Sequence, residues 1–360
     1  MSLQFLVAKH DLVFNFEART SRGAMRQRKV WMIKCFDSNQ PNVFGLGECA
    51  PLPGLSPELN DSFETSLYQH IQSFANLNLK EAIEKLNVER HAYPSSIVMA
   101  LEMAFYDLAN KGQRNYFSGE FEKGKSIPIN GLIWMADMDL MLQQIAIKIY
   151  DGFTCIKMKV GSLNFEKECD VVSYIRRKYY REDITIRLDA NGAFKTDEVF
   201  YKLNELAKFN IHSIEQPVKP KQHELMREVI KNSPIPIALD EELIGINEKQ
   251  EKEELLRYLQ PHYIILKPSL HGGFAGSEEW IQLAEKHKIG WWMTSALESN
   301  VGLYAIAQFT ANKGITMPQG LGTGKLYDNN IPGPLLVEKG ILRSFPEQPW
   351  NFDDLTFEPL

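Results

Sequence analysis

The sequence contains no apolar run long enough to span a bilayer, and its first residues lack the basic stretch, apolar stretch and cleavage site of a secretory signal. It has no excess of positive charge, because 40 Lys and Arg stand against 46 Asp and Glu and give a net charge of -6. A surface for nucleic acid or an anionic membrane requires a basic face, so we expect neither partner. We expect a cytoplasmic protein, either a monomer or a homo-oligomer, that acts on a small molecule.

Cysteine is also scarce. The four cysteines are widely spaced, without a Cys-x-x-Cys pair or a His at zinc-finger spacing, and they are Cys35, Cys49, Cys155 and Cys169. This pattern argues against a zinc finger and indicates reduced thiols. The remaining composition, 44% hydrophobic and 24% charged, is typical of a globular protein, and 360 residues suffice for one large domain and one smaller domain.

The first part of the chain, residues 1–122, has the pattern of an α+β domain. Residues 4–17 and 29–37 are rich in β-branched and aromatic residues and predict strands. Residues 61–88 and 95–112 have helical periodicity, and the second of these segments is apolar nearly all round, which predicts a buried helix. Strands followed by helices are typical of an α+β domain.

A different pattern begins near Lys125 and defines a second domain over 123–327. Short apolar runs alternate there with helical segments such as 165–179, where Asn164 is placed as an N-cap, and 197–208. The eight runs are 127–133, 155–160, 184–189, 211–215, 235–240, 263–267, 290–295 and a Gly-rich segment at 319–324. This alternation predicts an α/β fold, a parallel (β/α) barrel of the TIM type, with an open doubly wound sheet as the alternative.

Five of these predicted strands end in an ionisable residue, at separations of 25 to 30 residues, and the five residues are Lys159, Asp189, Glu215, Asp240 and Lys267. A single charge at a strand end usually marks only the solvated end of the strand. Consecutive strands of a parallel barrel, however, bring their carboxyl ends together on the face that holds the active site. Five charges in succession therefore predict a site.

The three carboxylates of this set predict a metal centre. Asp189, Glu215 and Asp240 would repel one another unless a cation neutralised them, and ligands that are all oxygen select a hard ion. We expect Mg²⁺, with Mn²⁺ as an alternative. Asn191, two residues beyond Asp189, is placed to support that ligand by a hydrogen bond, although it is equally consistent with a simple turn.

The lysines are the candidate catalytic residues. Lys157 and Lys159 lie two residues apart on one strand, so both point into the barrel. A lysine works as a base at neutral pH only if its pKa falls by about 3 units from ~10.4, which requires roughly 4 kcal/mol. One cation ~6 Å away supplies roughly 3 kcal/mol at an effective dielectric near 20. Lys157, Lys267 and the metal are such cations, while the carboxylates act in the opposite direction.

The sequence around these residues resembles the muconate-lactonizing branch of the enolase superfamily. The matching motifs span the whole barrel, and they are Ile-Lys-Met-Lys-Val-Gly from 156, Leu-Asp-Ala-Asn-Gly from 188, Ile-Glu-Gln-Pro from 214, Leu-Asp-Glu from 239 and Ile-Leu-Lys-Pro from 265. The resemblance implies a modified, enolase-like barrel. It also implies that residues 328–360 return to the N-terminal region and form with it an α+β capping domain over the barrel mouth.

Further motifs narrow the resemblance to the dehydratases of menaquinone biosynthesis within this branch. These motifs lie at 20–23, 129–134, 295–299 and 320–324. The resemblance implies a carboxylate substrate, with Lys159 as the base and with Lys267 and Mg²⁺ stabilising the enediolate. It implies that the substrate is bound by Arg22, Trp134, Ser295 and Gly322.

Three other interpretations remain open at this stage, and one of them, a structural or scaffold protein, predicts no metal. An N-acylamino acid racemase uses the same lysines, whereas the Asp-x-Asp that dipeptide epimerases carry after the eighth strand is missing from 319–325. A barrel that binds a metal and a carboxylate without turnover is the non-enzymatic alternative. A binder has no need of a neutral lysine, so the two lysines favour an enzyme.

Overall fold

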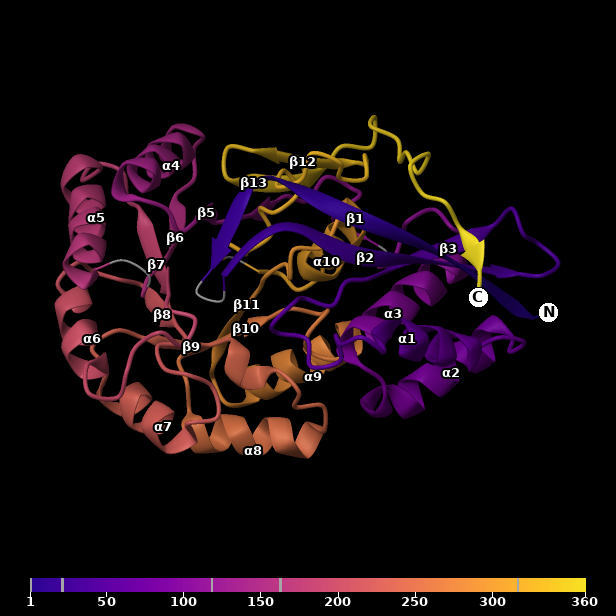
Figure 1. The fold of residues 1–360 in the computed structure, drawn as a ribbon, viewed down its shortest axis with the longest axis horizontal. Helices are drawn as coiled ribbons and strands as arrows, with labels where there is room; N and C mark the ends of the chain where they lie inside the picture. The colour runs from indigo at the N-terminus through magenta and orange to yellow at the C-terminus, as the bar shows by residue number, and fades with distance from the viewer. Residues whose placement is uncertain (1, 21–22, 118, 162–163, 316) are drawn as a thin grey trace.

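The structure is a computed structural model that describes residues 2–20, 23–117, 119–161, 164–315 and 317–360. Figure 1 shows a curled set of strands surrounded by helices on one side and a sheet with three helices on the other. No helix in these described ranges has both the length and the apolar character that a membrane crossing needs.

An antiparallel sheet forms the capping region, in the order β14-β1-β2-β3. Its strands are β1 (Leu3–Thr20), β2 (Gly23–Asp37), β3 (Phe44–Cys49) and β14 (Glu358–Pro359). Leu6 pairs with Pro359, so the end of the chain returns to this sheet, and Figure 1 shows the two termini close together. Strand β2 begins at Gly23, six residues earlier than predicted. Its first residues, 23–27, are mostly exposed and lack the hydrophobic alternation that would have predicted a strand.

Three helices cover one face of this sheet: α1 (Phe63–Gln72), α2 (Leu79–Glu89) and α3 (Ser95–Ala109). The helical periodicity of 61–88 is divided between α1 and α2, because Asn78 begins a new helix in a capping box with Glu81. Helix α3 is buried nearly all round, as predicted. It lies so close to β3 that a Cβ atom at Gly47 would be 1.9 Å from the Ala100 carbonyl oxygen.

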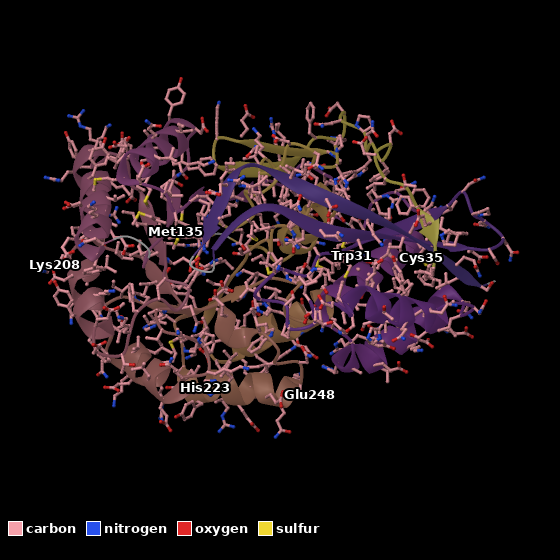
Figure 2. All side chains as sticks on the ribbon, in the orientation of Figure 1. Trp31, Cys35, Met135, Lys208, His223 and Glu248 are labelled. Atoms are coloured by element: carbon pink, nitrogen blue, oxygen red, sulfur yellow. The ribbon has the colours of Figure 1, made fainter. Side chains whose placement is uncertain are left out.

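The capping sheet is buried on both faces. Trp31 and Ile33 belong to the apolar cluster under α1–α3, whereas Leu12 and Met32 belong to the cluster that continues into the barrel. Figure 2 shows Trp31 and Cys35 within this sheet, whereas Lys208, His223 and Glu248 lie at the outer helices. The shared core fixes the capping region against the barrel.

The barrel is a seven-stranded parallel sheet in the order β11-β10-β9-β8-β7-β6-β5. Its strands are β5 (Gly131–Ile133), β6 (Cys155–Lys159), β7 (Thr185–Asp189), β8 (Ser213–Glu215), β9 (Ile237–Leu239), β10 (Tyr263–Leu266) and β11 (Gly290–Met293). Its helices are α4 (Met138–Tyr150), α5 (Phe165–Lys178), α6 (Val199–Ala207), α7 (His223–Asn232), α8 (Lys249–Leu259), α9 (Gly273–Lys286) and α10 (Asn300–Ala311).

The predicted eighth strand over 319–324 does not form a ladder. Single bridges join Gln319 to Ile129 and Gly320 to Thr294, and these bridges close the sheet between its two edge strands. The glycines of this segment disfavour a regular strand, because glycine loses more backbone entropy on folding than other residues and offers no side chain to pack. The closure excludes the open doubly wound alternative.

The structure also tests the predicted N-cap of helix α5. The Asn164 side chain accepts a hydrogen bond from the Glu166 N–H, so the predicted cap of α5 is confirmed.

After the eighth segment the chain leaves the barrel as β12 (Leu335–Glu338) and β13 (Ile341–Ser344), and β13 pairs with β4 (Ile127–Pro128). In the described segment 317–360 no helix follows the eighth segment.

Candidate active site

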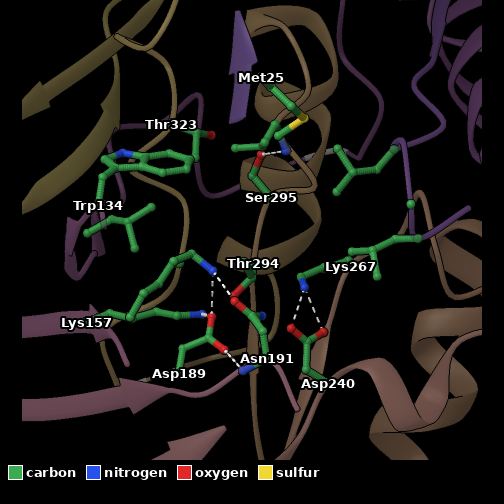
Figure 3. Close-up of a pocket in the computed structure, with 18 of the residues that line it drawn as sticks. Met25, Trp134, Lys157, Asp189, Asn191, Asp240, Lys267, Thr294, Ser295 and Thr323 are labelled. Atoms are coloured by element: carbon green, nitrogen blue, oxygen red, sulfur yellow. Dashed lines mark hydrogen bonds and ion pairs between the residues drawn. The ribbon is translucent and has the colours of Figure 1, made fainter. Parts of the chain in front are cut away.

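A cavity of about 360 Å³ lies at the carboxyl ends of the barrel strands, beneath the capping region. The capping region contributes Gly23, Ala24 and Met25 from the start of β2 and the loop 52–55 after β3. Figure 3 shows Met25 at one end of this cavity and the charged residues Lys157, Asp189, Asp240 and Lys267 at the other. The cavity therefore has an apolar lid and a charged floor.

The strand register brings the predicted charges together. Lys159 is paired with Asp189 across β6 and β7, and Asp189 is paired with Glu215 across β7 and β8. Asp240 and Lys267 directly follow β9 and β10, on the same side of the barrel. All five side chains are buried, as their convergence at a closed barrel mouth requires.

The lysines hold the carboxylates through short ion pairs. Lys157 Nζ lies 2.5 Å from Glu215 Oε2 and 3.2 Å from Asp189 Oδ2, while Lys159 Nζ lies 3.1 Å from the same Asp189 oxygen. Lys267 Nζ contacts both oxygens of Asp240. Lys159 and Lys267 stand on strands that three others separate, so they face each other across the cavity.

These contacts shift the pKa values of the buried groups. Burial, helped by the charges of Asp189 and Asp240 and opposed by Lys157, raises the pKa of Glu215 to about 8. For Asp189 burial acts upward as well, yet the ammonium groups around it, led by Lys157, hold its pKa below the ordinary value. Burial opposes the charge on Lys157, but the three neighbouring carboxylates raise its pKa overall and favour its charged form.

The predicted metal ligands fit a hard cation in their chemistry. In the ranges that the structure describes, no three acidic, His or Cys side chains converge on one point as a metal shell. The carboxylates form ion pairs with the lysine ammonium groups. Glu215 Oε1, however, is buried without a hydrogen-bond partner. A buried carboxylate oxygen left in this way is costly unless a cation or donor meets it. The oxygen chemistry of Asp189, Glu215 and Asp240 suits a hard cation such as Mg²⁺.

Asn191 contacts both the lysine and the carboxylate. Its Oδ1 accepts a hydrogen bond from Lys159 Nζ at 2.6 Å, and its backbone N–H donates to Asp189 Oδ1 at 3.0 Å. Its Nδ2 donates to Glu241 at 2.9 Å, which fixes the amide orientation. Asn191 has a positive φ of 43°, which also makes it the turn residue that the sequence allowed.

Three of the four residues predicted to bind substrate lie at the cavity. Trp134, Ser295 and Gly322 line the cavity. The Ser295 hydroxyl is engaged in the protein, because it donates to Glu298 Oε2 at 2.6 Å and accepts from the Leu297 N–H. Arg22 lies outside the described residues.

Sequence reasoning missed several residues of the cavity. Met25, Leu52, Leu55 and Leu297 form much of its apolar wall, and Asn130 and Thr323 add polar groups. The available signal was sequence position, because Asn130 and Thr323 lie within the motifs at 129–134 and 320–324. Individual apolar residues in loops carry no periodicity that would reveal them.

Buried carboxylates attach the capping region to the barrel behind the cavity. Glu48 of β3 accepts from the Ser299 N–H at 2.8 Å and the Gly302 N–H at 2.7 Å at the start of α10. Glu102 of α3 accepts from the N–H groups of Phe274 and Ala275 at the start of α9. Burial raises the pKa of Glu48 to about 6 and that of Glu102 to about 7, against these hydrogen bonds.

Lysines and carboxylates at the mouth of a modified barrel, under an α+β cap, define an enzyme site of the enolase type. Residues 141–349 match the family model described as enolase C-terminal domain-like, and the chain belongs to the enolase superfamily.

The chain is 40% identical to an o-succinylbenzoate synthase of Desulfotalea psychrophila, over 93% of this chain and 97% of that protein. The crystal structure of MenC from Desulfotalea psychrophila superimposes with a TM-score of 0.83 at 36% identity, covering 95% of this chain and all of that one. A dipeptide epimerase from Cytophaga hutchinsonii, solved with Mg and the dipeptide D-Ala-L-Val, has a TM-score of 0.84 at 20% identity over 99% of both chains. The last likeness concerns the fold alone.

Proposed function

We propose that this protein is an o-succinylbenzoate synthase, a Mg²⁺-dependent hydro-lyase of menaquinone biosynthesis. Its reaction is the syn dehydration of 2-succinyl-6-hydroxy-2,4-cyclohexadiene-1-carboxylate to 2-succinylbenzoate. The observation that carries the proposal is the pair of lysines, Lys159 and Lys267, that face each other across a buried cavity with acidic residues between them. The 40% identity to the Desulfotalea psychrophila enzyme supports the choice of substrate.

In this proposal Lys159 is the base. In its neutral form it takes the proton from the carbon next to the substrate carboxylate, and the electron pair of that C–H bond delocalises onto the carboxylate. Asn191, which accepts a hydrogen bond from Lys159 Nζ, orients the amine. The resulting Lys159 ammonium then gives its proton to the departing hydroxyl, which leaves as water while the ring becomes aromatic.

The other residues act by charge and position. The Lys267 ammonium stands on the opposite side and stabilises the negative charge that develops on the substrate carboxylate. Lys157, paired with Glu215 and Asp189 beneath the cavity, adds a fixed positive charge. Asp189, Glu215 and Asp240 would hold Mg²⁺, which supplies Lewis-acid stabilisation of the same developing charge.

The wall of the cavity would bind the rest of the substrate. Trp134 packs edge-on against Phe16 of the capping region, with ring centroids 5.1 Å apart, so the barrel and the cap meet at this side chain. Gly322 leaves room in the same wall. We also assign Arg22 to this pocket on the strength of its sequence motif alone.

A racemase or epimerase of N-acyl amino acids or dipeptides is the second candidate. One lysine on each side of an α carbon is the arrangement that proton transfer at both faces requires, and Lys159 and Lys267 offer it. A syn elimination needs only one of these lysines as a base.

The two functions separate in a direct assay. The purified protein, with Mg²⁺, is incubated with the cyclohexadiene substrate, and 2-succinylbenzoate is followed by absorbance and NMR. In parallel, N-succinylamino acids and dipeptides are incubated in heavy water and examined for deuterium at the α carbon. Dehydration supports the first proposal, exchange without dehydration would replace it with the second, and neither activity would reject both.

A further inference from the structure

A second cavity, of about 590 Å³, lies beside the candidate active site. The two cavities have part of their lining in common, namely Asn130, Leu132, Trp134, Gly322 and Thr323. Figure 3 shows Trp134 and Thr323 on the same side of the first cavity. This shared wall is the boundary across which a ligand in the active site would reach the second cavity.

The shared wall lies where the barrel sheet closes. Ile129, just before β5, meets the eighth segment there through a single bridge to Gln319 instead of a ladder. Since no helix follows the eighth segment within 317–360, helix α4 and residues 15–17 of β1 line the outer side. The second cavity therefore occupies the space between the barrel seam and the capping hairpin.

Two lysines face this cavity without an acidic partner. Neither Lys148 of α4 nor Lys325 has a carboxylate within ion-pairing distance among the residues that the structure describes, although both line the cavity. Lys148 Nζ lies 5.0 Å from the centre of the Phe153 ring, and Lys325 Nζ lies 3.5 Å from the Val337 carbonyl oxygen. Burial lowers the pKa of Lys148, and the nearby Lys325 charge adds to this effect against the opposing charge of Asp151.

The carboxylates of the cavity are already engaged. Glu17 lies 3.3 Å from the Arg26 guanidinium, and Asp137 accepts a hydrogen bond from the Leu140 N–H as the N-cap of α4. The rest of the lining is mainly apolar, with Leu140, Ile147 and Leu326 among its members. Two cations beside apolar walls suit an anionic group carried on a short apolar chain.

The shared wall also holds polar atoms that lack partners. Asn130 Oδ1 and Thr323 Oγ1 are buried and accept or donate no hydrogen bond within the described residues. Their residues are only 4% and 6% exposed, so bulk solvent does not satisfy them. Unpaired polar groups at such a position are expected where a ligand supplies the missing partner.

We propose that the second cavity is a subsite for the second carboxylate of a dicarboxylate substrate. Lys148 and Lys325 supply the counter-charge, and Asn130 and Thr323 bind the chain that passes the wall of the active site. The inference rests on the proposed function for the identity of this substrate, whose ring carboxylate would stay with Lys267 while its succinyl carboxylate enters the subsite.

The test is calorimetric titration of the full chain with two ligands. One is 2-succinylbenzoate, and the other is the same molecule with its distal carboxylate replaced by a methyl group. Lys148→Met and Lys325→Met are compared with Lys231→Met, which removes the same charge from an exposed position on α7. Loss of a charge-assisted contact should weaken binding of the dicarboxylate about tenfold or more, with unchanged affinity for the methyl analogue. Lys231→Met should bind both ligands as the wild type does.

Three results would overturn the subsite: equal affinity of wild type and both lysine variants for the dicarboxylate, an equal loss for both ligands, or no binding of the dicarboxylate by the wild type. The dehydration assay is a separate readout. Wild-type turnover with binding that is insensitive to both lysines would remove the subsite and keep the proposed function. Lysine-dependent binding without turnover would keep the subsite and remove the proposed function.

Discussion

Lys267 donates to both carboxylate oxygens of Asp240, at 2.7 and 2.6 Å, so a proposed catalytic lysine is held by a proposed metal ligand. The same relation holds between Lys159 and Asp189 at 3.1 Å. The ammonium groups of the lysines neutralise these acidic residues. Metal binding and lysine position are therefore expected to be coupled.

Asp240→Asn tests the metal centre. We expect Mg²⁺ affinity to fall by at least about tenfold, since loss of even a supporting contact to a metal ligand has an effect of that size. Dehydration should fall with it. Mn²⁺ binding by electron paramagnetic resonance and Mg²⁺ titration of chelator-treated protein are the measurements, and Asp170→Asn on the exposed face of α5 is the control. Full activity after chelation would contradict the assignment.

The two opposing lysines have separable roles. Lys159→Ala should lower kcat by at least about 10³-fold, because the proton acceptor is lost. Lys267→Arg keeps a positive charge but cannot act as a base, so some dehydration should survive while any racemisation stops. The measurement is the dehydration rate beside deuterium incorporation into an N-acylamino acid. Dehydration that survives in Lys159→Ala and disappears in Lys267→Arg would reverse the roles.

Glu102 predicts a pH-dependent stability. Its pKa is raised from 4.5 to about 7 in the folded protein, so the folded state binds this proton more tightly than the unfolded state. The contribution of Glu102 to the free energy of unfolding is then fully present below pH 4.5. It is lost as the pH rises through about 7, and it amounts to roughly 3 kcal/mol. Glu102→Gln should lack this component, as judged by urea unfolding of both proteins at several pH values. Glu251→Gln, exposed on α8, should keep the wild-type profile. Parallel pH profiles of wild type and Glu102→Gln would contradict the prediction.

Alanine substitution at Gly47 and at Gly322 should have contrasting effects, the first on stability and the second on substrate binding. Gly47→Ala places a Cβ atom 1.9 Å from the Ala100 carbonyl oxygen, so β3 and α3 must separate. We expect the free energy of unfolding to fall by about 1–3 kcal/mol. Gly322→Ala meets its nearest neighbour at 3.4 Å and should leave the unfolding free energy nearly unchanged while raising KM through the narrower cavity. Thermal unfolding and steady-state kinetics of both variants distinguish the effects. Equal melting temperatures for Gly47→Ala and wild type would show that the helix and strand can move apart.

Much of this protein is determined by local sequence. Short apolar runs predicted the barrel strands and a period of 3.6 predicted helices, because a buried strand is apolar and a helix buries one stripe whatever its partners are. Asn164 was recognisable as a cap for the same reason, since it bonds to a backbone N–H two residues away. The charged strand ends at 159, 189, 215, 240 and 267 followed from the regular length of a βα unit.

The tertiary structure decided what depends on contacts between distant segments. The ion pair of Lys157 with Glu215 joins residues 58 positions apart, and neither its geometry nor the pKa of the carboxyl follows from spacing. The eighth segment lost its ladder because glycine-rich backbone can be held by single bridges between two edge strands. The apolar lid around Met25 and the two lysines of the second cavity also depend on how distant segments pack, which local periodicity does not reveal. Their environment is set only when the capping region packs over the barrel.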